Sequence, residues 1–392
     1  MDTQDVVIIG GGITGVGIAQ AIAAAGFSVT LWERNTLGSE TSSNSSKLIH
    51  GGLRYLESGQ LSLVRQCLKE RQALLNLAPS LVHPIPFYLP VYSGAARGSI
   101  KIAAGLSLYA FLNEFDALSQ FSSVPRSEWN KLTSIKKVGL KRIFKYWDAQ
   151  TDDLLLTQAV SKSAQNLGAD IYENMDCSSI YHGAHVCQLT GENKKTDHIS
   201  EIKSRLVVNA CGPWVNDLLM KVSPIPMLAP VEWAQGSHLL LDIPPPTGVY
   251  YLESHLDKRM VFIMPWQDKT LIGTTEVKLP CAPKTVEMKP YEQHYLLKIY
   301  QYYFSQYDLS SLKNLIVKEF CGVRVLPVTD GGIFDRPRDT VIEKFPSHPC
   351  LLAVYGGKLT GFRTTAKEVV NWVQSRLGRR DFKVDIDRLI IK

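Results

Sequence analysis

Apolar runs of strand length alternate with longer runs of helical period along this chain, beginning near its N-terminal end. Val6 to Ile9 are four β-forming residues in a row, and they lead directly into the glycines at 10–12 and an alanine-rich apolar stretch over 16–25. A short buried run that ends in glycine and opens a helix is typical of the strand–turn–helix unit of a parallel sheet. The next run, at 28–33, predicts a second strand that ends in the carboxylate of Glu33.

The remaining pattern predicts further helices and strands and divides the chain into two domains. We expect helices over 61–77, 154–167, 291–304 and from about 360 to 377, and strands over 169–172, 205–210, 238–241, 260–264, 270–273 and 351–355. Strand–helix units at both ends and in the middle predict an α/β fold whose Rossmann-like domain is discontinuous, at 1–80, 150–215 and 325–392. A mainly antiparallel β-sheet domain, made of 81–149 and 216–324, is inserted into it.

The first turn carries a dinucleotide fingerprint. Gly10, Gly12 and Gly15 fit the pattern G-x-G-x-x-G, in which the glycines allow the turn, the close approach of a pyrophosphate and the packing of helix on strand. The helix that follows offers free N–H groups to phosphate, and Glu33 has the spacing of an acceptor for ribose hydroxyls. A plain glycine-rich turn is the alternative, but the strand, the helix and the acid together favour nucleotide binding.

Composition and charge narrow the class of protein. With 392 residues the chain is long enough for two domains, and its net charge of +6 suits a small anionic substrate or an anionic lipid surface. No nucleic-acid-binding motif is present, so we expect no nucleic-acid partner. Seven cysteines without paired spacing predict reduced thiols in the cytosol, and no export signal precedes the first strand. No cysteine–histidine cluster has ligand spacing, so we expect no metal site.

The segment Thr41–Glu57, which reads TSSNSSKLIHGGLRYLE, resembles the signature of the FAD-dependent glycerol-3-phosphate dehydrogenases, within the D-amino-acid-oxidase-like flavoproteins. Further runs similar to that family follow in its order, at 208–215, 236–238, 272–275, 322–324 and 356–360. The resemblance implies an FAD-binding domain and a substrate domain. It also implies oxidation of sn-glycerol 3-phosphate to dihydroxyacetone phosphate, with hydride transfer to flavin N5 and electrons passed to a quinone.

The sequence departs from this family at three places. Gly361-Phe362-Arg363 stands where the family commonly has Thr, Tyr and Arg, and Glu276 stands where an Asp is usual. The family's bacterial members usually carry a further helical domain, whereas this sequence ends shortly after Leu377. We therefore expect that domain to be absent, and the oligomeric state stays open.

The resemblance also implies roles for particular residues. The expected catalytic residues are His238 as the base, Arg324 and Lys358, with His50 as a second candidate base. A histidine pKa near 6.5 suits proton acceptance at neutral pH, and guanidinium donors match a phosphate. The expected substrate-binding residues are Arg54, Tyr55, Thr275 and Arg324. The expected cofactor-binding residues are Gly10, Gly12, Thr14, Gly15, Glu33, Ser42, Ser43, Ser46, Lys47, Leu48, His50, Gly212, Gly357, Lys358, Leu359 and Thr360.

One apolar stretch allows two interpretations. Residues 102–112 are too few to span a bilayer, but Arg97 and Lys101 precede them, as in helices that lie in an anionic membrane surface. A buried helix of the second domain is the alternative. The resemblance implies a monotopic enzyme, so we expect a cytoplasmic protein attached peripherally to the inner face of the cell membrane.

Two other functions compete with the dehydrogenase. A flavin oxidase would use oxygen on this or another small anionic substrate, and the sequence alone does not separate it from a dehydrogenase. A catalytically impaired FAD-binding paralogue would fit the expected loss of the C-terminal domain and the presence of Gly361. The presence of Arg54, His238, Arg324 and Lys358 favours an active enzyme.

Overall fold

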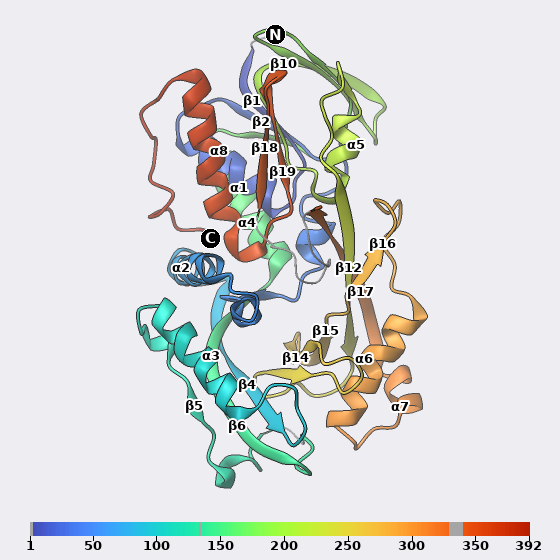
Figure 1. Cartoon of the computed structure of the whole chain (residues 1–392). Helices are drawn as coiled ribbons and strands as arrows, with labels where there is room; N and C mark the ends of the chain where they lie inside the picture. Colours follow the sequence, from blue (N-terminus) through green and yellow to red (C-terminus); the bar gives the residue numbers. More distant parts are fainter. Residues whose placement is uncertain (1–2, 133–134, 329–339) are drawn as a thin grey trace.

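Two β-sheets, each with its own helices, organise the chain in the computed structural model, which describes residues 3–132, 135–328 and 340–392. The first sheet lies in the upper half of Figure 1 and the second in the lower half. The chain passes several times from one sheet to the other, so neither half is a continuous segment of the sequence.

The first sheet has a parallel centre and an antiparallel extension. The parallel strands, in order across the sheet, are β7 (Asp170–Tyr172), β2 (Val29–Trp32), β1 (Gln4–Ile9), β10 (His198–Asn209) and β19 (His348–Tyr355). The strands that extend it are β9 (Cys187–Asn193), β8 (Met175–His182), β11 (Val222–Ser223) and β18 (Val341–Phe345). Strand β10 is long enough to pair with β9 through its first half and with β19 through its second.

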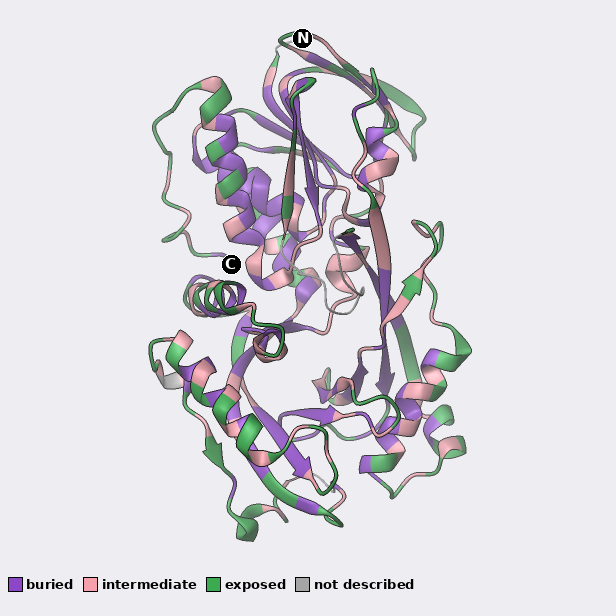
Figure 2. Cartoon of the chain, viewed as in Figure 1, coloured by how far each residue is buried: buried purple, intermediate pink, exposed green. Residues whose placement is uncertain are grey.

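Helix α1 (Ile13–Ala24) is the core of this half. Apart from Thr14 and Gln20 its side chains are apolar, and α4 (Asp153–Asn166) and α8 (Phe362–Leu377) enclose it against the sheet. The buried colour that covers α1 in Figure 2 shows the result. The fit is close, because a Cβ on Gly17 would lie 2.5 Å from the Phe362 ring. A helix without a polar face is stable only when buried in this way.

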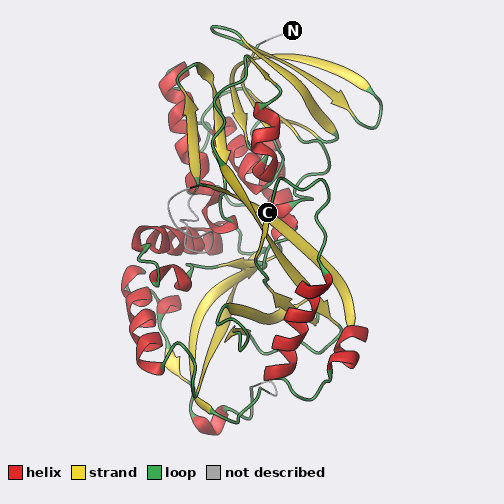
Figure 3. Cartoon of the chain, turned by 45° about the vertical axis from the view of Figure 1, so that its right-hand side comes forward, coloured by secondary structure: helices red, strands yellow, loops and turns green. Residues whose placement is uncertain are grey.

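The second sheet is antiparallel except where β4 (Val82–Tyr92) pairs with β13 (Val249–Glu253). Its other strands are β3 (Leu48–Ile49), β5 (Ser122–Ser123), β6 (Leu140–Thr151), β12 (Val231–Leu241), β14 (Met260–Trp266), β15 (Lys269–Gly273), β16 (Val277–Leu279) and β17 (Ile316–Pro327). Helices α2 (Leu61–Leu77) and α3 (Ser99–Leu112) pack on one face, and α6 (Pro290–Tyr303) and α7 (Leu309–Asn314) on the other. Figure 3 shows the helices on both sides of this sheet.

The loops at the carboxyl edge of the first sheet contain short 3₁₀ turns and one short helix. The turns are η1 (Thr41–Ser43), η2 (Leu53–Leu56), η5 (Gly212–Trp214) and η6 (Leu359–Gly361), and the helix is α5 (Val215–Leu219). Two further turns, η3 (Ala117–Ser119) and η4 (Arg126–Glu128), lie at the far end of the second sheet.

The expected helices all form, with α2 spanning 61–77 as predicted and the others within a few residues of their expected ends. The proposed domain ranges stay a prediction, and two short strands pair across them. Strand β3 pairs with β6 in the second sheet, although 48–49 lies within the range assigned to the first domain. Strand β11 pairs with β8 in the first sheet, although 222–223 was assigned to the second. The hairpin of β8 and β9 was not predicted.

The end of the described chain returns across the first domain. After α8, the backbone N–H of Lys383 donates to the carbonyl of Ala24, and that of Ile391 donates to the carbonyl of Leu77. Arg380 forms a bidentate ion pair with Asp5, at 2.7 and 2.9 Å. The returning segment 378–391 is therefore tied to α1, α2 and the start of β1.

A buried arginine joins this returning segment to two helices. Arg363 is 3% exposed, and it donates to the Glu70 carboxylate at 2.9 Å, to Asp387 and to the carbonyl of Ile386. Thr364 donates to the other Glu70 oxygen at 2.9 Å. The departure from the family pattern at 361–363 thus leaves an arginine that connects α8, α2 and the segment 378–391.

We predict that Arg363→Ala lowers the free energy of unfolding by about 3–5 kcal/mol, because it leaves the Glu70 carboxylate buried without its cation. Denaturant titration followed by fluorescence measures the change. Arg388→Ala is the matched control, because that arginine is 88% exposed in its pair with Asp385 and its loss should cost less than about 1 kcal/mol. Equal effects of the two substitutions would contradict the assignment.

Candidate active site

A cavity with a volume of about 340 Å³ lies between the two sheets. Its upper wall consists of the residues that follow the carboxyl ends of β1, β2, β10 and β19, and its lower wall includes parts of β12 and β17. Ligands of open parallel sheets bind at this edge, where loops and helix N-termini converge. The cavity is therefore the candidate site.

The first glycine turn is packed too tightly for any side chain. Gly10 has φ +112°, and a Cβ there would lie 2.5 Å from the carbonyl oxygen of Ala210. A Cβ on Gly15 would lie 1.9 Å from the carbonyl oxygen of Gly10. Gly12 and Thr14 line the cavity at the start of α1, where backbone N–H groups point along the helix axis. Gly15 does not line the cavity, and its lack of a side chain lets α1 pack closely against the Gly10 turn.

Glu33 faces the same end of the cavity from the end of β2. Its carboxylate accepts hydrogen bonds from the backbone N–H of Gly11 at 2.6 Å and of Asn35 at 2.8 Å. Burial raises the pKa of Glu33, and these two hydrogen bonds oppose that shift. The neighbouring Arg34 lies 4.0 Å from the centre of the Trp214 ring, and both residues line the cavity although the sequence did not single them out.

A second glycine turn faces the first. Gly356 and Gly357 follow β19 with φ of +72° and +113°, and a Cβ on Gly357 would come within 3.5 Å of the Thr14 hydroxyl. Leu359 and Thr360 continue the cavity wall into α8. The cavity thus runs between two glycine turns that begin two packed helices.

Lys358 lies in this second turn with its ammonium group buried. The Nζ atom has no hydrogen-bond partner among the described residues and lies 4.0 Å from the centre of the Tyr55 ring. A buried cation without an acceptor is costly, and contact with one aromatic face replaces little of its hydration. Because Lys358 and Tyr55 both line the cavity, the ammonium is placed to receive an anionic or carbonyl group of a ligand.

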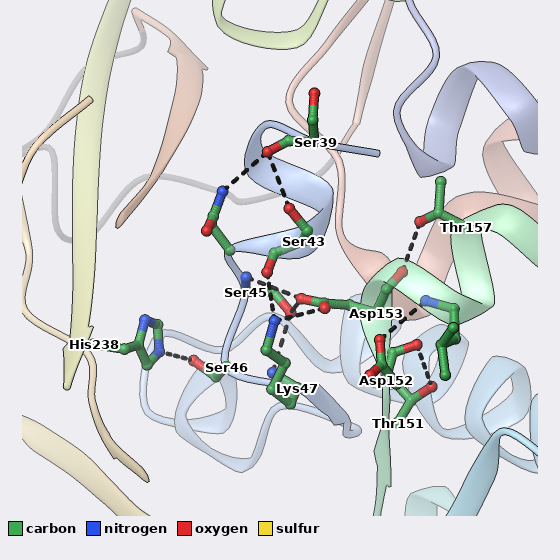
Figure 4. Close-up of polar contacts among 12 residues, drawn as sticks. Ser39, Ser43, Ser45, Ser46, Lys47, Thr151, Asp152, Asp153, Thr157 and His238 are labelled. Carbon is green, nitrogen blue, oxygen red and sulfur yellow. Dashed lines mark hydrogen bonds and ion pairs between the residues drawn. The ribbon is translucent and has the colours of Figure 1, made fainter. Parts of the chain in front are cut away.

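The serine-rich loop divides into residues that line the cavity and residues that hold the loop. Figure 4 shows the contacts of Lys47 with Ser43 and Asp153, and that of Ser46 with His238. Ser42 and Ser46 line the cavity, and the Ser42 hydroxyl accepts from the backbone N–H of Ile13 at 2.9 Å. The Lys47 ammonium forms a buried ion pair with Asp153 at 2.6 Å and donates to the carbonyl of Ser43. Ser43 and Lys47 do not line the cavity, so their contacts hold the loop in place.

Leu48, His50 and Gly212 complete the upper part of the cavity. The backbone N–H of His50 donates to the Thr360 hydroxyl at 3.3 Å, which connects the loop to the second glycine turn. Burial lowers the pKa of His50 to about 4; the charge of Asp148 opposes this shift, and that of Lys358 adds to it. His50 is therefore uncharged at neutral pH.

His238 lines the lower part of the cavity and is only 2% exposed. Its ring stacks on Phe320 at 5.0 Å, its Nε2 hydrogen-bonds the Ser46 hydroxyl at 2.8 Å, and its Nδ1 has no partner among the described residues. Burial, followed by the charges of Lys47 and Arg324, lowers the pKa of His238 to about 3. The expectation of a pKa near 6.5 is therefore wrong, because it ignored desolvation and the two cations.

The expected anion-binding residues occupy different places. Arg324 lines the cavity from β17, and its guanidinium lies 3.3 Å from the Glu276 carboxylate. Arg54 lies outside the lining, with its guanidinium 5.6 Å from the centre of the Tyr55 ring. Thr275 also lies outside, since its hydroxyl is held between Glu292 at 2.6 Å and the backbone N–H of Ser237 at 3.0 Å. The adjacent Thr274 lines the cavity instead.

A buried polar network supports the Gly51-Gly52 turn beneath Arg54. Asp148 accepts from Arg71 at 2.5 Å and from the Tyr109 hydroxyl at 2.8 Å, and Tyr109 in turn accepts from the backbone N–H of Gly51 at 2.9 Å. These residues come from β6, α2 and α3, so no local sequence pattern could have connected them.

Comparisons with known proteins agree with this geometry. A family described as FAD dependent oxidoreductase matches residues 5–363. Aerobic glycerol-3-phosphate dehydrogenase of Escherichia coli is 34% identical over 94% of this chain and 73% of its own length. D-erythritol 1-phosphate dehydrogenase of Brucella abortus is 33% identical over 93% of this chain and 72% of its own length.

Solved structures share the fold. The FAD complex of the Bacillus halodurans glycerol-3-phosphate dehydrogenase matches 100% of this chain and 68% of its own, with a TM-score of 0.75 at 24% identity. L-alpha-glycerophosphate oxidase from Mycoplasma pneumoniae, with FAD bound, matches 97% of this chain and 98% of its own, with a TM-score of 0.76 at 18% identity. With its glycine turns, Glu33 and the cavity between the sheets, this chain belongs to the FAD-dependent oxidoreductase family.

Proposed function

We propose that this chain catalyses the FAD-dependent oxidation of sn-glycerol 3-phosphate to dihydroxyacetone phosphate. The observation that carries the proposal is the meeting of two cations, Arg324 and Lys358, with the uncharged His238 in the wall of one cavity. An anion-binding group and a proton acceptor are what oxidation of a phosphorylated alcohol requires. The names of relatives at 34 and 35% identity over most of the chain support the choice of substrate.

The residues present fit FAD. Glu33 would accept hydrogen bonds from the ribose, and the N-terminus of α1 with Ser42 would hold the pyrophosphate. The unpartnered Lys358 ammonium and the turn at Gly357 would meet the flavin end of the cavity. When bound, FAD accepts the hydride from the substrate's secondary alcohol carbon.

Arg324 is the proposed phosphate-binding residue. A guanidinium donates two parallel hydrogen bonds to a phosphate, and the Glu276 carboxylate at 3.3 Å orients it toward the cavity. Arg54 supports the same end from behind the Tyr55 ring, where its positive charge adds to the field without contacting the cavity. Thr274, which takes the place expected for Thr275, supplies a hydroxyl to this wall.

His238 is the proposed base for the hydroxyl proton. The Ser46 hydrogen bond and the Phe320 ring hold its imidazole in one orientation. A substrate phosphate dianion beside Arg324 would offset the two cations that depress the pKa of His238. The imidazole therefore becomes a stronger base when the substrate binds, which is when a base is needed.

The second candidate substrate is D-erythritol 1-phosphate, because a relative of that name is 33% identical over 93% of this chain. Both molecules present a phosphate and an alcohol, and they differ in chain length, so the Arg324 contact would serve either.

We propose a quinone as the electron acceptor, and oxygen is the alternative acceptor.

We also propose peripheral attachment to the inner face of the cell membrane through α3. No described helix is long and apolar enough to cross a bilayer. One face of α3 is buried through Ile102, Leu106 and Tyr109, while the opposite face exposes Ile100 at 88% and Phe111 at 63%. Phe115, just after the helix, is 64% exposed and packs edge-on against Phe111.

The buried face of α3 fits a core helix of the second domain, and the exposed apolar face supports the proposed membrane contact. Figure 2 shows the exposed positions along α3 on the outside of the molecule. Arg65 lies beside Phe111 and Phe115, and Lys101 is exposed on α3, although Arg65 pairs with Glu114 and Lys101 with Glu57. An apolar stripe with basic neighbours suits an anionic lipid surface.

We predict that Arg324→Ala lowers kcat/KM for glycerol 3-phosphate by about 2–4 kcal/mol, mainly through KM, because a charge-assisted bidentate contact is lost. Arg324→Lys should recover little of this, since an ammonium cannot reproduce the fork. Dye reduction against substrate concentration measures both, with flavin content as the check on folding. The exposed Arg142→Ala serves as a control, and wild-type KM in Arg324→Ala would argue for another substrate.

We predict that His238→Ala lowers kcat roughly a hundredfold, and that the ratio of wild-type to variant kcat/KM stays constant between pH 5 and 8. The reason is that the pKa of His238 in the free protein, about 3, keeps the imidazole uncharged over that whole range. Steady-state rates across pH measure the ratio, with the exposed His294→Ala as a control. A ratio that rises through pH 6.5 would show an unperturbed histidine.

We predict that the FAD-loaded protein co-sediments with phosphatidylglycerol-containing vesicles, and that the double substitution Ile100→Asp and Phe111→Asp abolishes this. Both side chains are exposed, so flavin content and dye reduction should be unchanged. Met227→Asp is the control, since Met227 is 87% exposed but lies outside α3. Retention of vesicle binding in the double variant would exclude α3 as the membrane contact.

A further inference from the structure

A histidine and two cysteines meet at the end of the first sheet that is remote from the cavity. One ligand atom each from His182, Cys187 and Cys350 lies within 4.8 Å of the other two, and the cluster is the one group of this kind among the described residues. None of the three lines the cavity. Cys350 lies near the amino end of β19 and Gly356 follows its carboxyl end, which separates the cluster from the second glycine turn by about 20 Å of extended chain.

Sheet register, and not sequence spacing, brings these residues together. His182 ends β8 and Cys187 begins β9, and the two are paired across the hairpin. Cys187 is paired in turn with Ser204 of β10, and β10 also pairs with β19, where Leu351 lies opposite Val207. Strand β1 pairs along the other side of β10, so the hairpin end and the start of β19 meet end to end along the same side of β10. The expectation of no metal site considered only residues close in sequence, so it could not detect this cluster.

The surroundings hold the three side chains in place. The His182 Nε2 accepts a long hydrogen bond, 3.4 Å, from the backbone N–H of Cys350, which already holds the ring over that residue. The His348 ring lies 4.7 Å from the His182 ring. His348 is itself fixed by the carbonyl of Pro224 at 2.7 Å and by the Ser347 hydroxyl at 2.9 Å. His348 thus supports the cluster from behind with both ring nitrogens already engaged.

Both cysteines are free thiols, and their location is enclosed. Cys187 is fully buried and Cys350 is 7% exposed, while His182 is half-buried and leaves a path from solvent. Burial raises the pKa of Cys187 to about 12 and also raises that of Cys350, although the nearby Arg376 opposes the second shift. Burial and the neighbouring His348 lower the pKa of His182, so its ring is uncharged and has a lone pair at neutral pH.

We propose that His182, Cys187 and Cys350 form a binding site for one thiophilic d¹⁰ metal ion of the Zn²⁺ or Cu⁺ class. Two thiolates and one imidazole are the donor set that such ions prefer over harder cations such as Mg²⁺ or Ca²⁺. Binding releases two protons, one from each thiol, and replaces the long hydrogen bond to His182 if Nε2 is the ligand. No electron is transferred in this step.

The site would fasten the β8–β9 hairpin to the start of β19. The hairpin extends the first sheet in antiparallel fashion and pairs with its parallel centre through β10, whereas β19 belongs to that parallel centre. A metal ion bonded to residues from all three strands adds a cross-link at that edge. Because the cluster lies outside the cavity, we expect metal binding to affect the stability of the first domain and not the chemistry of the flavin.

The test is equilibrium binding of Zn²⁺ to the FAD-loaded full chain after treatment with a thiol reductant and a chelator. We expect one tightly bound Zn²⁺ per chain, and with Cd²⁺ a thiolate-to-metal charge-transfer band in the ultraviolet, where it can be separated from flavin absorbance by difference. Cys350→Ser and Cys187→Ser should each weaken Zn²⁺ binding roughly a hundredfold or more, since each removes one of three strong ligands. His182→Gln, at a half-buried position, tests the third ligand with little risk to folding.

The controls separate this site from the protein's other thiols. Cys281→Ser removes an exposed thiol, and Cys67→Ser removes a buried one, and neither should change the Zn²⁺ stoichiometry. Flavin content should stay at the wild-type level in every variant. Zn²⁺ binding that is unaffected by all three cluster substitutions would overturn the proposal. So would a Cys187–Cys350 disulfide in protein isolated under reducing conditions, detected by peptide mass spectrometry.

Discussion

The architecture depends on the contact of backbone with backbone at Gly10, Gly15 and Ala210. Helix α1 can begin directly at the end of β1 only because Gly15 has no Cβ to strike the Gly10 carbonyl, and β10 can lie beside that turn only because Gly10 has none either. This close approach places an apolar helix against the parallel strands and directs its N-terminus into the cavity. Every other wall of the cavity is built around that helix end, including Glu33, the serine loop and the second glycine turn.

The positive charges that would attract a phosphate also lower the pKa values of the two histidines that line the cavity. Lys358, Arg324 and Lys47 lie in or just behind the cavity wall, and burial with such cations lowers the pKa values of both His50 and His238. In the proposed function, these cations would keep both imidazoles uncharged without an anion beside them. Binding of a substrate phosphate would offset the cations and raise the basicity of His238.

Local patterns were sufficient for the main helices and for the first glycine turn, although they did not predict the β8–β9 hairpin. The glycine turn, Glu33 and the helices at 61–77 and 362–377 follow from apolar periodicity and from residues adjacent in sequence. Patterns were insufficient where the answer depends on a distant partner. Lys47 is held by Asp153, Thr275 by Glu292, and the turn at Gly51 by Tyr109 and Asp148, and none of these pairs is close in sequence. The cysteine–histidine cluster is another such case, because it arises from strand register alone.

The returning segment 378–391 joins the two described ends of the chain to each other. Arg380 binds Asp5 at the start of β1, and Ile391 is buried against the end of α2 at 2% exposure. Detachment of this segment would uncover part of α1 and release the first strand of the sheet, so fraying at one end propagates to the other. In a protease-protection or pulling experiment the two ends should therefore open as a single mechanical unit, and engineered fusions at the C-terminal side would report on the integrity of the nucleotide-binding half.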